Sequence, residues 1–364
     1  MVCLWPLAVF DCQEGNPHGK IILNLVCLLT ARKCLTYEVI YIKLLDYEGD
    51  IDGICKQIHS ATKGWGTNED GLIAALGSLG PVERWHVATR YEAEYGEKLV
   101  DLMKKESGGS DFGTAIQLLA QPIEEAECSI LKRACSGIGT KEKLVVLVLS
   151  GRTNKEIKVL KQKFYGMYGE DLAVKMAGEL SGNMEKFITA CLQAEEVPYN
   201  PEIHTEEKAE EDARLFDKAG REQFGTDEST LFKIICESPP EYLKMVNLKY
   251  VERAGYSLVR SIEKELDGDD EKAAKHALNM KLKPRETAAI FIESTMKGIG
   301  TDEYCLTASI LMFQGIMGQG YPAYEKEYDK SLAKRVKGEL RGDFEKLLLA
   351  MIDANVKMDY EEEA

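Results

Sequence analysis

The sequence has almost none of the side-chain patterns by which enzymes and zinc sites are recognised. Its 10 cysteines contain no C-x-x-C pair, and its 5 histidines have no metal-ligand spacing. These absences argue against a zinc site and a disulfide framework, and scattered cysteines in apolar segments favour reduced thiols in the cytosol. No G-x-x-x-x-G-K-[ST] loop, G-x-S-x-G elbow or H-E-x-x-H helix occurs. We therefore predict that the protein is not an enzyme, and we expect the glycine-rich residues 315–320 to connect two helices.

Positive charge and long hydrophobic runs are also scarce. Lysine and arginine number 46 against 61 aspartates and glutamates, which gives a formal net charge of −15. This balance argues against nucleic acid as a partner. It also argues against direct attraction to an anionic membrane, unless bridging cations invert the local charge. The apolar run at residues 21–30 is too short to span a bilayer.

The two chain ends carry little information. Residues 1–49 are interpreted as a variable leader, and the alternatives are a translation start placed too far upstream or a weak signal peptide. The last alternative lacks support because no lysine or arginine precedes the apolar stretch at residues 3–10. Residues 357–364 are interpreted as a solvated acidic tail.

What the sequence does contain is one glycine loop in four copies. In three copies two glycines enclose an apolar residue and are followed by threonine; the third copy, at residues 219–226, is longer. The second glycines are Gly66, Gly139, Gly225 and Gly300, spaced by 73, 86 and 75 residues. A period of this kind indicates an internal repeat.

Each loop has a glutamate at a nearly fixed distance. Glu106, Glu179, Glu265 and Glu339 follow the second glycines by 40, 40, 40 and 39 residues. Paired glycines allow positive φ, so that several backbone carbonyls can point to one side. Carbonyls plus one carboxylate are hard oxygen ligands, which suit calcium better than zinc or copper. We expect the threonine after each loop to cap the helix that follows.

The rest of each repeat is predicted to be helical. The run at residues 145–149 resembles a buried strand when read alone, but its equivalent at residues 231–235 has helical spacing. Pro81 and the Pro239-Pro240 pair mark further helix starts. We predict an all-α protein with about five short helices in each of four repeats, at residues 50–121, 122–195, 209–283 and 284–356. Residues 196–208 are predicted to be a linker.

The repeated pattern resembles the calcium-binding repeat of the annexin family over roughly residues 50–356. The resemblance is carried by Met296-Lys297-Gly298-Ile299-Gly300-Thr301-Asp302-Glu303 and by the strings at residues 178–182 and 338–342. The longer third loop is similar to that of the four-repeat animal members. The resemblance implies a divergent four-repeat annexin shaped as a curved disc. Residues 313–315 depart from the Ser-Arg-Ser-like turn of the family, whose arginine survives only as Arg152.

The resemblance also implies one Ca²⁺ site per repeat, in which water and a lipid phosphate oxygen complete the shell. Each site would use three loop carbonyls and one glutamate carboxylate. In repeat order the residues are Thr62, Gly64, Gly66 and Glu106; Cys135, Gly137, Gly139 and Glu179; Gly220, Gln223, Gly225 and Glu265; and Met296, Gly298, Gly300 and Glu339.

The loop tips suggest contact with a membrane. The tip residues Trp65, Ile138, Phe224 and Ile299 are all apolar, and Lys63 and Lys297 flank two of the loops. Apolar side chains gain free energy at a membrane interface, and lysine could reach lipid phosphate. The alternative is that the tips fold back on their own repeat and the lysines are merely solvated.

These features predict a cytoplasmic protein that binds acidic phospholipid, such as phosphatidylserine, peripherally on the cytosolic face when calcium rises. A site with one carboxylate should bind calcium alone weakly, at or beyond ~10⁻⁵ M. Calcium and lipid should therefore tighten each other, and four sites should add avidity. The alternative is a calcium-insensitive cytoskeletal or membrane scaffold, whose protein partners the sequence does not identify.

Overall fold

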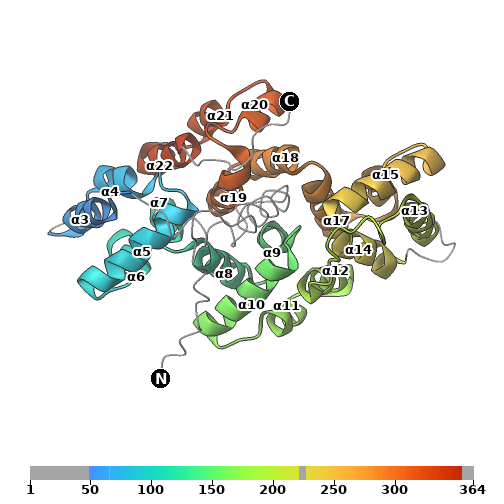
Figure 1. The fold of residues 1–364 in the computed structure, drawn as a ribbon. Helices are drawn as coiled ribbons and strands as arrows, with labels where there is room; N and C mark the ends of the chain where they lie inside the picture. Colours follow the sequence, from blue (N-terminus) through green and yellow to red (C-terminus); the bar gives the residue numbers. More distant parts are fainter. Residues whose placement is uncertain (1–48, 65, 221–226, 355–364) are drawn as a thin grey trace, which may run out of the picture.

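A computed structural model describes residues 49–64, 66–220 and 227–354. Within these residues it contains 20 α-helices, numbered α3 to α22, and no strand (Figure 1). The predicted all-α class with four repeats is confirmed. Most of the predicted leader, the acidic tail, and the site residues Trp65, Gln223, Phe224 and Gly225 lie outside the described residues.

The helices divide into five for each repeat, although α13 of the third repeat begins at Glu206, within the residues predicted to be linker. The first two repeats contain α3 (Ile51–Thr62), α4 (Glu69–Leu76), α5 (Pro81–Tyr95), α6 (Leu99–Ser107) and α7 (Asp111–Leu119), then α8 (Ile123–Ala134), α9 (Glu142–Leu149), α10 (Asn154–Tyr168), α11 (Leu172–Glu179) and α12 (Gly182–Gln193). The last two contain α13 (Glu206–Gly220), α14 (Glu228–Glu237), α15 (Pro240–Ala254), α16 (Leu258–Glu265) and α17 (Gly268–Leu282), then α18 (Pro284–Met296), α19 (Glu303–Met317), α20 (Pro322–Tyr328), α21 (Leu332–Glu339) and α22 (Gly342–Asp353).

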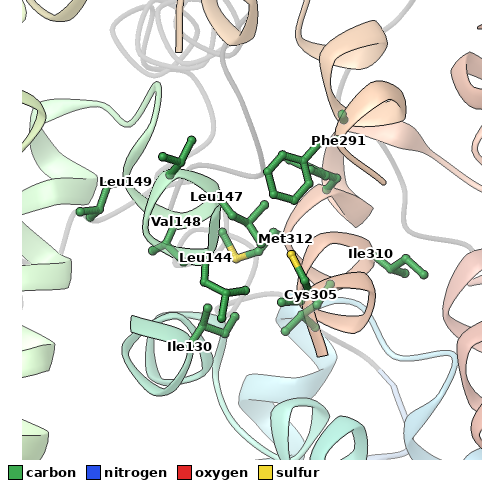
Figure 2. Close-up of a cluster of buried hydrophobic side chains, with 14 of the residues drawn as sticks. Ile130, Leu144, Leu147, Val148, Leu149, Phe291, Cys305, Ile310 and Met312 are labelled. Carbon is green, nitrogen blue, oxygen red and sulfur yellow. The ribbon is translucent and has the colours of Figure 1, made fainter. Parts of the chain in front are cut away.

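The strand-like run of the second repeat is a helix, as predicted. All six residues from Leu144 to Leu149 in α9 are buried. Figure 2 shows why: Leu144 and Leu147 on α9 lie in one apolar cluster with Ile130 on α8 and Phe291 and Met312 of the fourth repeat. A helical segment that is covered on all sides needs no polar face, so residues 144–149 are apolar without interruption, whereas Glu142 and Lys143 at the start of α9 are only half-buried.

The fourth repeat departs from the other three. Helix α19 has 15 residues, against 8 in α4 and α9, and α20 has 7, against 15 in α5. Residues 313–315 therefore lie inside a helix and not in a turn. The expectation that residues 315–320 connect two helices is wrong for Gly315 to Met317, because the buried apolar face of α19 continues to Met317.

The repeats pack around a common centre. Helices α4 and α7 of the first repeat contact α22 and α19 of the fourth, while α12 of the second contacts α14 and α17 of the third. In Figure 1, α8, α9 and α19 surround the middle, and α9 contacts both of the others. This arrangement places segments that are far apart in the sequence side by side.

The linker between the second and third repeats is anchored to the third repeat through Lys281. Lys281 on α17 pairs with Glu196 at 3.0 Å. The same ammonium group donates to the carbonyls of Ile235, Cys236 and Ser238 at the end of α14, at 2.7, 3.0 and 2.7 Å. Lys281 thus joins the linker to two helices of the third repeat.

None of the helices in the described part of the chain combines the length and the hydrophobicity needed to cross a bilayer.

Candidate metal centre

The glycines of the three described loops adopt the conformation that the sequence predicted. Their φ angles lie in the left-handed region, where a residue with a Cβ atom is strained. The values are +119° and +79° at Gly64 and Gly66, +103° and +78° at Gly137 and Gly139, and +112° and +85° at Gly298 and Gly300. The two loop glycines therefore have similar φ angles in repeats one, two and four.

Each loop is closed by the same backbone hydrogen bond. The amide after the threonine donates to a carbonyl in the last turn of the preceding helix, and all four bonds measure 2.9 Å. The pairs are Asn68 to Ala61, Lys141 to Ala134, Asp227 to Ala219, and Asp302 to Thr295. The third pair spans one residue more than the others, which agrees with its longer loop.

The distant glutamate lies directly beside its loop. The Thr67 hydroxyl lies 3.3 Å from the main-chain carbonyl oxygen of Glu106 and 3.4 Å from its Oε2. The Thr140 hydroxyl lies 2.8 Å from the main-chain carbonyl oxygen of Glu179 and 3.3 Å from its Oε2. In the fourth repeat the Thr301 hydroxyl donates to the Oε2 of its glutamate at 3.1 Å. The carboxylates are half-buried. Loop and carboxylate, although 38 or 39 residues apart, thus form one site.

This contact corrects the role predicted for the threonine. The N-cap is the residue that follows the threonine. The N-cap side chain accepts a backbone hydrogen bond in repeats one, three and four: Asn68 from Gly71, Asp227 from Thr230 and Asp302 from Cys305. The N-cap Lys141 of the second repeat makes no such bond. A threonine hydroxyl can serve either purpose, and here the glutamate is its partner.

The third site is partly described. A Cβ atom placed on Gly220 would lie 3.0 Å from Glu265 Cγ and 3.2 Å from Glu265 Cδ. The side chain of Glu265 therefore lies against the end of α13, where only glycine leaves room. This brings the first and the last predicted ligands of that site together.

The glutamates differ in the charge that lies beside them. Lys175 forms an ion pair with Glu179 at 2.7 Å, and the hydrogen bond from that ammonium lowers the pKa of Glu179. Arg335 forms an ion pair with Glu339 and lowers the pKa of that carboxyl in the same way. Within the described residues, no lysine or arginine forms an ion pair with Glu106.

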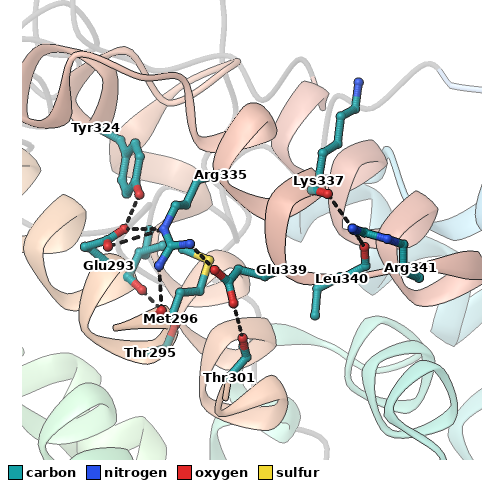
Figure 3. Close-up of polar contacts among 11 residues, drawn as sticks. Glu293, Thr295, Met296, Thr301, Tyr324, Arg335, Lys337, Glu339, Leu340 and Arg341 are labelled. Atoms are coloured by element: carbon teal, nitrogen blue, oxygen red, sulfur yellow. Dashed lines mark hydrogen bonds and ion pairs between the residues drawn. The ribbon is translucent and has the colours of Figure 1, made fainter. Parts of the chain in front are cut away.

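Arg335 is the site residue that sequence reasoning missed. Its guanidinium contacts Glu339, Glu293 and the carbonyl oxygen of Met296 (Figure 3). A readable signal was the spacing of four residues between Arg335 and Glu339 on one helix, which places the two side chains on the same face.

The described loop tips are fully exposed. Ile138 and Ile299 have relative exposures of 109% and 110%, so neither side chain folds back on its own repeat. Lys63 and Lys297 are also exposed. No group of three or more His, Cys, Asp or Glu side chains in the described part of the chain could hold a metal ion.

The family model named Annexin matches four segments of the chain, residues 54–118, 125–191, 211–275 and 317–351. The chain belongs to the annexin family. Annexin A13 of Homo sapiens is 32% identical over 304 residues, which cover 83% of this chain and 95% of that protein.

Solved annexin structures have the same fold. The structure of annexin III is similar with a TM-score of 0.77 at 27% identity, covering 85% of this chain and 96% of that one. The structure of chicken annexin V in complex with Zn²⁺ gives a TM-score of 0.75 at 28% identity, with coverage of 85% and 96%. The fourth segment matched by the family model begins at residue 317, so it leaves out the fourth loop, whereas the first three segments include theirs.

Proposed function

We propose that this annexin binds acidic phospholipid membranes peripherally and reversibly, through calcium ions held between the glycine loops and their glutamates. Members of the family generally bind phospholipid in this calcium-dependent way. The finer statements, on which residues hold calcium and where in the cell binding occurs, are our own proposals for this chain.

The first loop carries the proposal. Gly64 and Gly66 have positive φ, nothing lies within 4 Å of where their Cβ atoms would be, and the Glu106 carboxylate is adjacent through Thr67. The available donors are oxygens, and the single carboxylate leaves room for ligands from outside the protein. This donor set fits calcium. The carbonyls of Thr62, Gly64 and Gly66 with Glu106 would hold the ion.

Bound calcium would supply positive charge at the surface of a protein whose formal net charge is −15. The chain's own residues would hold the ion and contact the lipid. Glutamate and carbonyls fix the position of the ion, and the exposed Lys63 and Lys297 lie where lipid phosphate would approach. Ile138 and Ile299 enter the interface, where an exposed apolar side chain loses its unfavourable contact with water.

The same donor set explains why calcium and lipid should act together. One carboxylate per site gives weak binding of calcium alone, at or beyond ~10⁻⁵ M. A phosphate oxygen adds a missing ligand, so each partner raises the affinity of the other by the same factor. We therefore propose a cytoplasmic protein that moves to the cytosolic face of membranes when calcium rises.

The test is co-sedimentation of the full chain with vesicles that contain phosphatidylserine and with pure phosphatidylcholine vesicles, across calcium concentrations. We expect binding to the acidic vesicles only, with release on addition of a chelator. Equal binding with and without calcium would favour the scaffold alternative.

A pair of matched variants locates the metal. Glu106→Gln removes one carboxylate charge from the first loop and should shift the calcium midpoint upward. Glu252→Gln makes the same change at an exposed position on α15, outside the loops, and should leave the midpoint unchanged. Equal shifts in both variants would attribute the effect to net charge and would contradict the assigned site.

A further inference from the structure

The fourth loop differs from the others because a cation of the chain already contacts its predicted ligands. The guanidinium of Arg335 on α21 forms an ion pair with Glu339 Oε1, and its NH2 group donates to the Met296 carbonyl at 2.5 Å (Figure 3). Met296 and Glu339 are the first and the last of the four ligands expected there. One side chain therefore joins both ends of the predicted calcium shell.

Other residues hold Arg335 in this position. Its Nε atom donates to the two carboxylate oxygens of Glu293 at 3.3 and 3.1 Å, and the Tyr324 hydroxyl donates to Glu293. Glu293 lies on α18 and Tyr324 on α20, so α20 supports the carboxylate of α18 that holds the guanidinium. The Arg335 side chain is only 18% exposed. Its placement is therefore fixed by packing as well as by the loop.

Calcium and the guanidinium compete for the Met296 carbonyl oxygen and for the Glu339 carboxylate. Calcium needs its oxygen ligands at about 2.3–2.6 Å. The Nη2 atom of Arg335 lies 2.5 Å from the Met296 carbonyl oxygen, which is within the same range. Two positive charges this close repel each other. To admit calcium, the guanidinium of Arg335 would have to leave both Glu339 and the Met296 carbonyl.

The equivalent positions in the other repeats do not have this arrangement. The residue four positions before the glutamate is Leu102, Lys175, Ser261 and Arg335 in the four repeats. Lys175 contacts Glu179, but among the described residues it makes no hydrogen bond to the loop carbonyl of Cys135. Ser261 pairs with the Tyr250 hydroxyl at 2.8 Å. Arginine in the fourth repeat is thus the one side chain of this set that joins glutamate and loop.

We propose that Arg335 takes the place of calcium in the fourth repeat, so that the chain's own cation closes this loop and the protein holds at most three calcium ions. This inference rests on the proposed function for the other three loops. The fourth loop presents Ile299 and Lys297 whether or not calcium is present.

The test counts bound calcium by equilibrium dialysis of the full chain with phosphatidylserine vesicles, after subtraction of calcium bound by vesicles alone. Glu339→Gln should leave the number of ions unchanged, whereas Glu106→Gln should lower it by one. Arg335→Met should raise it by one, and Arg335→Met combined with Glu339→Gln should restore the original number. Loss of one ion in Glu339→Gln, or no gain in folded Arg335→Met, would overturn the proposal.

Controls separate this proposal from simpler effects. Lys337→Met removes the same charge from an exposed position on α21 and should leave the count unchanged; a gain equal to that of Arg335→Met would overturn the proposal. If circular dichroism shows that Arg335→Met does not fold, the calcium count of Glu339→Gln tests the proposal by itself: an unchanged count supports it, and the loss of one ion overturns it. If the unaltered protein binds no calcium, the proposed function fails, and a calcium ion gained by Arg335→Met would still support the substitution by arginine.

Discussion

At the scale of single residues, the site depends on contacts between a loop and a glutamate on another helix. The threonine hydroxyl links the two in repeats one, two and four, and in the third repeat Glu265 packs against Gly220. Each contact positions a carboxylate before any ligand arrives. Pre-positioning of this kind lowers the free energy lost when a ligand binds.

We predict that Gly220→Ala damages the third site. The new Cβ atom would lie 3.0 Å from Glu265 Cγ, so the glutamate side chain must move away from the loop. The expected results are one calcium ion fewer in the dialysis assay and a loss of about 1–3 kcal/mol in the free energy of unfolding, since overpacking a tight contact is destabilising.

The matched control is Gly166→Ala in α10. Gly166 is also helical, but nothing lies within 4 Å of its Cβ position. Alanine there should stabilise the protein by about 0.5–1 kcal/mol through helix propensity and should leave calcium binding unchanged. If Gly220→Ala and Gly166→Ala had the same calcium count and the same free energy of unfolding, the contact between Gly220 and Glu265 would be contradicted.

The sequence predicts the positions of these residues better than their partners. The positive φ angles of the loop glycines could be predicted from the residue type. The four glutamates could be identified from their nearly constant distance to the second glycine of each loop. The contact of Thr301 with Glu339, and that of Arg335 with Met296, join residues 38 and 39 positions apart. Such pairs form only when α21 packs beside the loop, which one sequence without its fold does not reveal.

At the scale of the elements, helix length in the fourth repeat was the least predictable feature. No proline occurs between Thr301 and Pro322, and the apolar run of α19 continues past the position where the family has a turn. Gly315 lies inside this helix, where glycine costs roughly 1 kcal/mol relative to alanine. Burial of the apolar side chains around it outweighs that cost.

Lys281 gives a prediction at the same scale. Lys281→Met removes the cation from the buried carboxylate of Glu196 and from three carbonyls at the end of α14. We expect a loss of about 3–5 kcal/mol in the free energy of unfolding, because removing one partner of a buried ion pair is strongly destabilising. Urea unfolding measures this loss, and Glu196→Gln in the same chain should recover part of it.

Lys272→Met is the control for that measurement. Lys272 pairs with Asp269, and both side chains are more than half exposed. Exposed pairs contribute about 0–1 kcal/mol, so this variant should unfold almost as the unaltered protein does. A loss for Lys281→Met no greater than that for Lys272→Met would show that the linker is not anchored through this lysine.

At the scale of the whole molecule, the membrane binding that we propose would use several loops at once. Ile138 and Ile299 lie in different repeats, and both are fully exposed. We predict that Ile138→Ala and Ile299→Ala each weaken binding to phosphatidylserine vesicles by about 1–2 kcal/mol, or roughly 5- to 30-fold. In the double variant the two factors should multiply, because tethered contacts combine.

Leu248→Ala tests whether loop position matters. Leu248 on α15 is also an exposed apolar residue, at 63%, but it lies outside the glycine loops. The Leu248→Ala substitution should leave vesicle binding unchanged. Leu248→Ala, Ile138→Ala and Ile299→Ala should each alter the free energy of unfolding by no more than ~0.5 kcal/mol. If Leu248→Ala weakened binding as much as the loop variants, the tips would have no special role.

The contact between α9 and α19 has a consequence for biosynthesis. The apolar residues of α9, from Leu144 to Leu149, leave the ribosome long before Cys305 to Met317 of α19, which cover them in the finished protein. At about 5–20 residues per second, the roughly 160 residues between them take ~8–32 s to synthesise. During that interval a strongly hydrophobic helix lacks its cover, so the nascent chain should be a substrate for chaperones until its last repeat emerges.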